Sequence, residues 1–286
     1  MSKNSFPSLV RGKSEERGTL AFVGMGLWDH NGISLSGIRS ARKADEVYAE
    51  FYTSVMPGLN IAHLERRIGK RITVASRHDL EEDADWRILE RAKGRRVVLL
   101  VPGDPLAATT HVSLRLRAFE LGIKTEIVHA ASIFSAAPSL TGLQHYKFGR
   151  AVTIPLPQEG HLPLSSYDVV LDNFSRGLHT LVLLDLNVES GEFLSIQGAL
   201  ALMLRIENIR KKSVFTKDRI LLGVAHAGSP EPTVKCGYIK DLMEADFGAP
   251  PYTLIVPGEL HFMEAETLVK LFGAPGSLLT RRDAGK

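Results

Sequence analysis

Residues 96–111, with the sequence RVVLLVPGDPLAATTH, decide how this chain folds. Val97–Val101 is a short apolar run rich in β-branched side chains, which is typical of a buried parallel strand. The Pro-Gly-Asp-Pro that follows predicts a tight turn, because proline fixes φ and glycine accepts unusual backbone angles. Helical spacing then covers Thr109–Leu121, whose first two threonines are candidate caps. This order places Asp104 at the carboxyl end of a strand, where open α/β sheets bind ligands.

Strand and helix patterns alternate on both sides of this segment, which predicts a mostly parallel sheet in the N-terminal half. The expected strands are 19–23, 46–52, 72–75, 97–101 and 125–129, and the expected helices are 36–44, 61–68, 78–93 and 109–121. The charged helix over 78–93 is expected to be exposed. Gly24 and Gly26 follow the first strand and resemble half of a dinucleotide-binding motif, but the third glycine is missing.

The C-terminal half begins after a stretch rich in proline and glycine, residues 147–166, which predicts a linker. Beyond it, strands are expected at 179–186, 219–225, 233–238 and 252–256, and helices at 167–176, 194–209 and 261–272. We therefore expect an α/β fold with two domains, a mostly parallel sheet in residues 19–148 and a mixed sheet with helices in residues 167–286, joined by a linker at 149–166. Residues 1–18 are polar and basic, which predicts a disordered leader.

Composition narrows the class of protein. The net charge of +3 over 286 residues is too small to indicate nucleic acid. Cys236 is the single cysteine, so there is no intrachain disulfide and no cysteine-based zinc cluster. The sequence has no phosphate-binding loop and no metal-ligand spacing, and no apolar run approaches the roughly 20 residues that span a bilayer. We expect no metal, no nucleic-acid partner and no membrane insertion, with the cytoplasm as the default compartment.

Several polar residues have a functional and a structural interpretation. The carboxylate of Asp104 can bind a ligand or cap the turn, and its two flanking prolines favour the ligand. Tyr48, Glu50 and Tyr52 would share one face of a strand, where they can line a polar pocket or pack beneath a helix. His226 and His261 are expected to be hydrogen-bonded structural or pocket residues.

Six motifs occurring in this order resemble those of the diphthine synthases. They are GMGLWD (24–29), YAEFYTS (48–54), VPGDPLAATTH (101–111), HAASIFSA (129–136), GLQHYKFG (142–149) and VPGELH (256–261). The resemblance extends from Thr19 to about Pro275, and the wider relatives are the tetrapyrrole methylases, which have a two-domain α/β architecture. The form of the VPGDPL loop is similar to that of the archaeal members.

The resemblance implies an S-adenosylmethionine-dependent methyltransferase that is a cytoplasmic homodimer and releases S-adenosylhomocysteine. Its substrate would be translation elongation factor 2, at a histidine that carries a 3-amino-3-carboxypropyl group. Repeated methylation of that amino group would give diphthine. In such enzymes the cofactor lies in the cleft between the domains. The resemblance assigns its contacts to Leu27, Asp104, Ala107, Ser132 and Ile133 of the first domain, and to Leu184, Ala227 and Tyr252 of the second.

Tyr252 stands where the resemblance leads us to expect histidine, although a tyrosine ring can also lie against adenine. No general base is assigned, because the substrate amine can lose its proton to water before it enters a desolvated cleft. Tyr48, Glu50, Tyr52 and His111 are candidates for the substrate side, with packing and capping as the alternative explanation.

Three other functions compete with this interpretation. A tetrapyrrole or precorrin methylase would share the fold and the cofactor but bind an acidic macrocycle. A non-catalytic nucleotide-binding protein would bind the cofactor without transferring a methyl group. A dehydrogenase is the weakest alternative, because the third glycine of the dinucleotide motif is missing.

Overall fold

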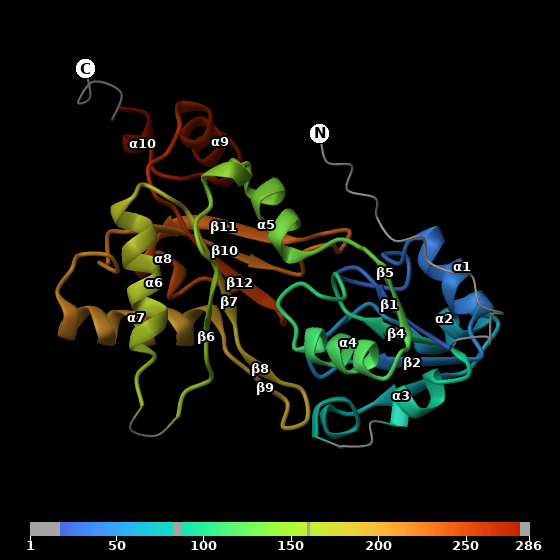
Figure 1. The fold of residues 1–286 in the computed structure, drawn as a ribbon. Coiled ribbons are helices and arrows are strands. Elements are labelled where there is room, and N and C mark those ends of the chain that lie inside the picture. The colour runs from blue at the N-terminus through green and yellow to red at the C-terminus, as the bar shows by residue number, and fades with distance from the viewer. Residues whose placement is uncertain (1–17, 83–86, 159–160, 281–286) are drawn as a thin grey trace, which may run out of the picture.

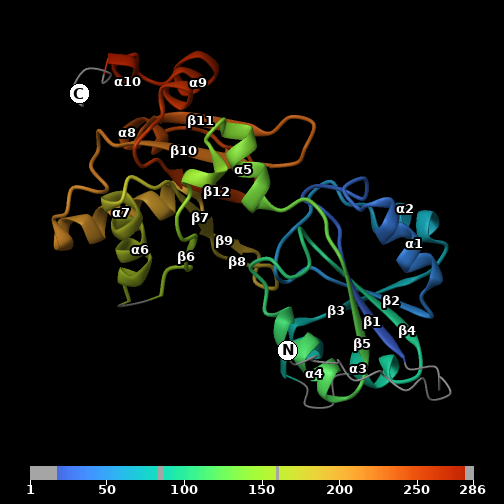
Figure 2. The same ribbon diagram turned by 45° about the horizontal axis from the view of Figure 1, so that its top comes forward.

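The computed structural model describes residues 18–82, 87–158 and 161–280, which form two α/β lobes (Figure 1 and Figure 2). The predicted leader lies outside the described residues except for Gly18, which is buried and donates a hydrogen bond to the Lys93 carbonyl at 3.2 Å. Within the described ranges, no helix has the length and apolar character needed to cross a bilayer.

The first lobe contains a five-stranded parallel sheet with the order β3-β2-β4-β1-β5. Its strands are β1 (Thr19–Gly24), β2 (Glu46–Glu50), β3 (Ile72–Ala75), β4 (Arg96–Val101) and β5 (Lys124–Val128). The side chains of the central strands β1 and β4 alternate between two hydrophobic cores, one on each face. Continuous apolar runs in the sequence are the consequence of this burial on both faces.

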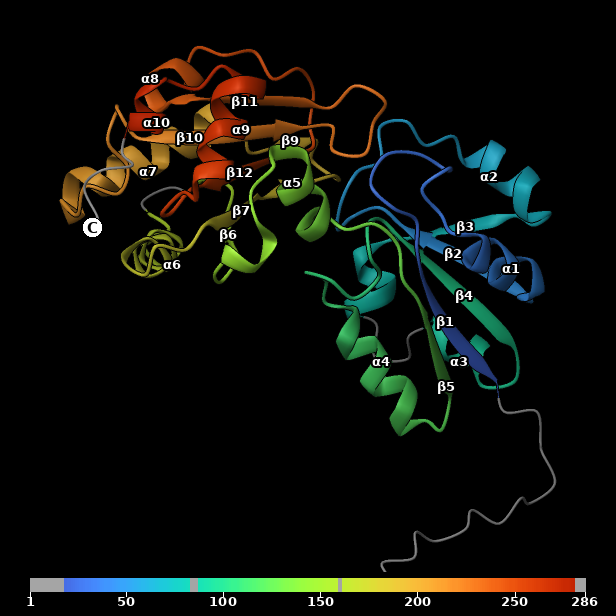
Figure 3. The ribbon, with the colours of Figure 1, turned by 90° about the horizontal axis from the view of Figure 1, so that it is seen from above.

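Helices cover both faces of this sheet, as Figure 3 shows. On one face lie α1 (Leu35–Lys43) and α2 (Ile61–Ile68), and on the other lie α3 (Arg87–Ala92) and α4 (His111–Glu120). The helices that follow β1 and β4 therefore lie on opposite faces, and the loops leading to them diverge. Such a switch point leaves a crevice at the carboxyl ends of the strands.

Two glycines hold these diverging loops together at their base. The amide of Gly103 donates to the carbonyl of Gly26 at 2.7 Å, and the amide of Gly26 donates back at 3.2 Å. Their φ angles are 71° and 79°, in the left-handed region that glycine adopts without a steric penalty. The predicted turn after β4 is therefore fastened to the turn after β1.

The second lobe contains a mixed five-stranded sheet with the order β11-β10-β12-β7-β6, in which only β6 and β7 are parallel. Its strands are β6 (Val152–Ile154), β7 (Thr180–Leu184), β10 (Ile220–Ala225), β11 (Thr233–Tyr238) and β12 (Tyr252–Val256). Residues of α6 (Leu164–Ser175), α7 (Ile196–Arg210) and α8 (Ile239–Leu242) pack on one face, and residues of α5 (Ile133–Thr141) and α9 (Phe262–Phe272) pack on the other. The short α10 (Ser277–Thr280) follows α9, and a hairpin of β8 (Leu186–Asn187) and β9 (Glu192–Phe193) extends from β7.

The expected fold class, a parallel sheet followed by a mixed sheet, is confirmed, but several elements differ from the prediction. The single helix expected over 78–93 is a π-helical turn, η1 (His78–Glu82), and the separate helix α3, with residues 83–86 outside the described ranges. It is also not simply exposed, because Leu80, Ile88 and Leu89 are buried in the core. The strand expected over 46–52 ends at Glu50, where the chain turns towards the crevice.

The stretch predicted as a linker contains β6, which pairs with β7 in the second sheet. The preceding helix α5, which lies in the predicted first domain, also packs on the second sheet through Ala137. The domain limits at 148 and 166 remain a prediction. The packing of α5 favours a chain that passes from the first lobe to the second between Val128 and Ile133.

Candidate functional site

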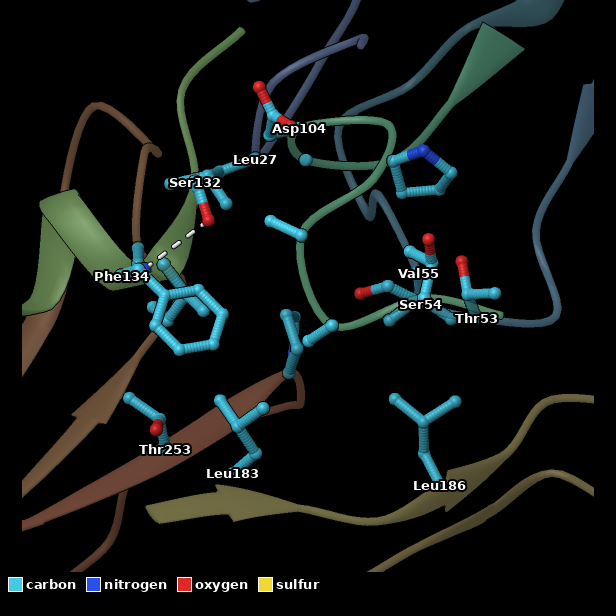
Figure 4. Close-up of a pocket in the computed structure, with 18 of the residues that line it drawn as sticks. Leu27, Thr53, Ser54, Val55, Asp104, Ser132, Phe134, Leu183, Leu186 and Thr253 are labelled. Carbon is cyan, nitrogen blue, oxygen red and sulfur yellow. Dashed lines mark hydrogen bonds between the residues drawn. The ribbon is translucent and has the colours of Figure 1, made fainter. Parts of the chain in front are cut away.

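A pocket lies where the crevice of the first sheet meets the second lobe (Figure 4). Its walls come from the loops after β1, β2 and β4, from the start of α5, and from the ends of β7, β10 and β12 in the second sheet. The lining residues are Gly26, Leu27, Thr53, Ser54, Val55, Pro102, Gly103, Asp104, Ala107, Ala108, Thr109, Ser132, Ile133, Phe134, Leu183, Leu184, Leu186, Val224, Ala227, Pro251, Tyr252 and Thr253.

All eight residues predicted to contact a cofactor line this one pocket. Five belong to the first part of the chain and three to the second: Leu27, Asp104, Ala107, Ser132 and Ile133, then Leu184, Ala227 and Tyr252. They are separated by up to 225 positions in the sequence (252 minus 27), and the fold brings them together. The contact of each with a ligand remains a prediction.

Asp104 is held at the pocket by neighbours from its own loop and from the end of β5. Its Oδ2 accepts a hydrogen bond from Nδ1 of His129 at 2.7 Å and one from the amide of Ala130 at 3.4 Å. Its Oδ1 accepts a weaker bond from the amide of Leu106 at 3.4 Å. The carboxylate thus partly caps its own turn, as the structural alternative predicted, while it lines the pocket.

The two lobes touch beside this pocket through the loop after β1 and the turn after β10. A Cβ added to Gly228 would lie 2.8 Å from Cβ of Leu27, so the second lobe approaches too closely for any side chain at this position. The rings of Trp28 and His226 meet edge to face with centroids 5.3 Å apart. His226 is therefore a contact between the lobes, which agrees with its expected structural role.

Helix α5 begins at the pocket. Ser132 is its N-cap residue, and the Ser132 side chain accepts a hydrogen bond from the amide of Phe134 at 3.3 Å. The first turn of a helix carries backbone amides without intrahelical partners, which can donate to a ligand at this point. Thr110 also occupies an N-cap position, in α4, but makes no cap with its side chain and donates to Glu81 instead. The expected threonine cap on α4 is therefore wrong.

The electrostatics of the pocket favour a ligand with positive charge. Among the described residues that line it, Asp104 is the only carboxylate and none is lysine, arginine or histidine. Leucine, isoleucine, valine and alanine side chains supply much of the remaining surface, and Tyr252 adds an aromatic ring. A sulfonium compound with an adenosine group has this combination of cationic, aromatic and polar parts, so the residues present fit S-adenosylmethionine.

A buried polar cluster lies directly behind the first-lobe wall. The carboxylate of Glu50 accepts hydrogen bonds from the amide of Thr53 at 3.1 Å and from its hydroxyl at 2.5 Å. His111 points Nδ1 at the carbonyl of Pro105, at 3.3 Å, and Nε2 at the hydroxyl of Tyr52, also at 3.3 Å. Because a carbonyl only accepts hydrogen bonds, Nδ1 carries the proton and Nε2 accepts from Tyr52.

These three candidates for the substrate side stand behind the wall, and the fourth lies elsewhere. Glu50, Tyr52 and His111 are buried, and Glu50 contacts the pocket wall through Thr53. Tyr48 instead donates to Glu46 at 2.8 Å and lines a separate surface cavity next to β3. Tyr48 and Tyr52 both pack against the core on the α3 and α4 face of the sheet and neither lines the pocket, so the packing alternative holds for the two tyrosines.

Two groups at this site were not predicted from the sequence. Thr53, Ser54 and Val55 line the pocket, and the available signal was the YAEFYTS motif, which ends with Thr53 and Ser54 and directly precedes Val55. His129, the partner of Asp104, begins the HAASIFSA motif. No cluster of metal-ligating side chains occurs in the described part of the chain.

Comparison with known proteins gives a consistent result. Residues 19–242 match the family of Tetrapyrrole (Corrin/Porphyrin) Methylases. The chain is 46% identical to the diphthine synthase of Methanosarcina mazei over 91% of this chain and 98% of that one. It is 44% identical to the diphthine synthase of Methanococcoides burtonii over 92% of this chain and 100% of that one.

Solved structures agree with these relatives. A crystal structure of diphthine synthase superposes with a TM-score of 0.81 at 42% identity, covering 92% of this chain and 99% of that one. A putative diphthine synthase from Entamoeba histolytica superposes with a TM-score of 0.80 at 32% identity, covering 88% and 97%.

Proposed function

The chain belongs to the diphthine synthases of the tetrapyrrole methylase family, and we propose that the pocket between its lobes is where methyl transfer takes place. The chain is accordingly an S-adenosylmethionine-dependent methyltransferase of diphthamide biosynthesis that acts on elongation factor 2. The observation that carries the proposal is that all eight residues assigned to the cofactor by resemblance line a single pocket with one carboxylate and no basic side chain.

The bound cofactor supplies an electrophilic methyl group on a positively charged sulfur. We assign its binding to the eight residues, with Asp104 as the negatively charged group and Tyr252 as the ring that lies against adenine. The amides at the start of α5 and the apolar side chains of β7 would orient the remaining parts. In-line transfer needs the nucleophilic nitrogen close to the methyl carbon, so positioning and exclusion of water supply much of the rate.

The substrate nitrogen is the amino group of the 3-amino-3-carboxypropyl histidine. We propose that it is methylated repeatedly, which requires the amine to be neutral before each transfer. A pocket without lysine or arginine does not repel the positive charge that the substrate nitrogen carries after each methyl transfer. Elongation factor 2 works with cytoplasmic ribosomes, so we place the enzyme in the cytoplasm.

We also propose a homodimer, as the resemblance implies. Val112, Leu116 and Phe119 are exposed at spacings of four and three residues on α4, so they share one face of that helix. A run of large exposed apolar side chains is unusual on a monomer and typical of an interface. A second copy of this chain is the occupant that we assign to it.

The direct test is incubation of the protein with S-adenosylmethionine and elongation factor 2 that carries the aminocarboxypropyl group. Mass spectrometry should find added methyl groups on the modified histidine. Elongation factor 2 with an unmodified histidine is the matched control and should gain none. A protein that binds the cofactor but transfers no methyl group to either would contradict the proposal.

The tetrapyrrole alternative is tested in the same assay. A precorrin replaces the protein substrate while the labelled cofactor and the enzyme are unchanged. We expect label in elongation factor 2 only, and label in the macrocycle alone would favour the small-molecule methylase.

A further inference from the structure

We propose that Glu50 and Thr53 form a proton relay that takes a proton from the substrate ammonium, with Glu50 as the terminal base. This inference rests on the proposed function and names a role that the methyl-transfer pocket itself does not supply. It begins from a side chain that the cofactor site leaves unused: Glu50 is a carboxylate with no exposed surface, immediately behind the pocket wall.

Thr53 connects the buried carboxylate to the pocket. The Thr53 hydroxyl donates to Oε1 of Glu50 at 2.5 Å, and the Thr53 amide donates to Oε2 at 3.1 Å. Thr53 also belongs to the residues that line the pocket. A hydroxyl both donates and accepts, so Thr53 can receive a proton from the pocket while it passes its own to Glu50.

The relay lies apart from three of the predicted cofactor residues of the first lobe. Figure 4 shows Leu27, Asp104 and Ser132 on one side of the pocket and Thr53, Ser54 and Val55 on another. Asp104 is itself engaged by His129 at 2.7 Å. The side near Thr53 is thus the part of the pocket that the assigned cofactor contacts leave for the substrate amine.

No strong counter-ion stabilises the charge of Glu50. In the described part of the chain, the only group able to carry positive charge within 4.0 Å of its carboxylate is His111, at 3.9 Å. Burial lowers the pKa of His111, which disfavours the charged form of the ring, and its two nitrogens face Pro105 and Tyr52. Burial of Glu50 raises its own pKa to about 7, with Glu81 adding negative charge from η1.

The remaining groups around Glu50 do not offset this burial. The backbone amide of Tyr52 also donates to Glu50. The hydroxyl of Tyr52 lies 3.3 Å from Nε2 of His111 and interacts with Glu81, which accepts a hydrogen bond from Thr110. The guanidinium of Arg77 lies over the ring of Tyr52, 5.3 Å from its centroid, and makes an ion pair with Glu81. A carboxylate in this setting can exchange a proton near neutral pH, as a general base must.

A second fully buried glutamate shows what a purely structural carboxylate looks like in this chain. Glu264 accepts hydrogen bonds from the ammonium of Lys147 at 2.6 Å, from Nε2 of His179 at 3.0 Å and from the amides of Gln144 and His261 at 2.7 Å. Burial opposes its ionisation, but these donors lower its pKa to about 2. In place of such a cation, Glu50 is bonded to the hydroxyl of Thr53, which lines the pocket.

The step balances in protons and electrons. One N–H proton of the substrate ammonium passes to the oxygen of Thr53 while the Thr53 hydroxyl proton passes to Oε1 of Glu50. The freed lone pair on nitrogen forms the bond to the methyl carbon, and the electrons of the breaking C–S bond stay on sulfur. The proton returns from Glu50 through Thr53 to water when the pocket opens, so the relay is ready for the next methylation.

The test compares Glu50→Gln, Thr53→Val and Thr53→Ser with the full-length wild-type protein. Single-turnover methyl transfer to modified elongation factor 2 is measured between about pH 6 and pH 10. We expect Glu50→Gln and Thr53→Val to slow transfer at pH 7 by roughly 100-fold, as general-base removal does. The loss should shrink as pH rises, because solution then deprotonates the amine. Thr53→Ser keeps the hydroxyl and should recover most of the rate that Thr53→Val loses at pH 7.

A second measurement does not depend on turnover. The side-chain carboxyl carbon of Glu50, observed by ¹³C NMR in the protein without cofactor, should titrate near pH 7. A carboxyl that stays ionised down to about pH 5, or Glu50→Gln and Thr53→Val proteins whose pH profiles match the wild type, would overturn the relay. If the wild type transfers no methyl group at any pH, the proposed function fails instead, so the two failures are distinguishable. If Glu50→Gln does not fold, the comparison of Thr53→Val with Thr53→Ser tests the relay.

Discussion

At the scale of single residues, Asp104 gives the sharpest prediction about the cofactor site. Asp104→Asn keeps the size of the side chain but removes its charge, and a charge-assisted hydrogen bond contributes roughly 1.5–3 kcal/mol. We expect the Kd for S-adenosylmethionine, measured by calorimetry, to rise about 10- to 100-fold. Asp79→Asn, which removes a carboxylate bonded to Ser76 in a different cavity, should leave this Kd unchanged. If Asp104→Asn binds S-adenosylmethionine as tightly as the wild type, the carboxylate does not contribute to the cofactor site.

The two buried glutamates make opposite contributions to stability as pH changes. Glu264 has a lowered pKa of about 2. It therefore contributes stability above the pKa of the unfolded chain, and this is lost as pH falls towards 2. Glu50 has a raised pKa of about 7, so the folded state holds its proton more tightly and stability falls as pH rises from about 4.5 to 7.

Urea unfolding as a function of pH tests this difference. Glu264→Gln leaves the Lys147 ammonium without its carboxylate, and breaking such a buried pair costs roughly 3–5 kcal/mol. The variant should lose this amount at pH 7 and much less near pH 2. In Glu50→Gln, the decline in stability between about pH 4.5 and pH 7 should disappear. A wild-type pH dependence in both variants would contradict the assignments.

At the scale of elements, the seam between the loops after β1 and β4 decides whether the pocket forms. A Cβ on Gly24 would lie 2.6 Å from the carbonyl oxygen of Gly103 and 2.8 Å from Cβ of Ala130. Gly24→Ala must therefore push the two loops apart, and overpacking of this kind costs typically 1–3 kcal/mol. We expect a lower melting temperature together with weaker cofactor binding.

Gly94→Ala is the matched control for this substitution. A Cβ at Gly94 meets nothing within 4 Å, and the residue has no positive φ. Calorimetry and thermal melting should show little change in this variant. A Gly24→Ala protein with unchanged cofactor affinity would show that the seam does not shape the pocket.

At the scale of the whole molecule, the proposed homodimer predicts the behaviour of α4. Phe119→Glu places a charge on the exposed apolar face and should shift the protein from dimer to monomer in sedimentation velocity. Ile209→Glu changes a similarly exposed apolar side chain on α7 and should leave the dimer intact. A Phe119→Glu protein that sediments as the wild type would place the interface elsewhere.

The sequence by itself determined the fold class and most of the strands and helices, because local patterns reflect burial directly. The run at Val97–Val101 is apolar on both faces, and that is possible only in the middle of a covered parallel sheet. The motifs also identified the eight pocket residues, and Asp104 between two prolines was visible as a rigid strand-end acid. These features depend on neighbours in sequence or on a shared family pattern.

Only the tertiary structure decided which side chains meet. The contact of Thr53 with Glu50, the distance from Asp104 to His129 and the approach of Gly228 to Leu27 all depend on loops whose course is fixed by packing. The helix expected over 78–93 was wrong in part for the same reason, and the stretch expected as a linker contains β6. Burial of Leu80 and the pairing of β6 with β7 depend on distant parts of the chain, and local propensity carries no information about them.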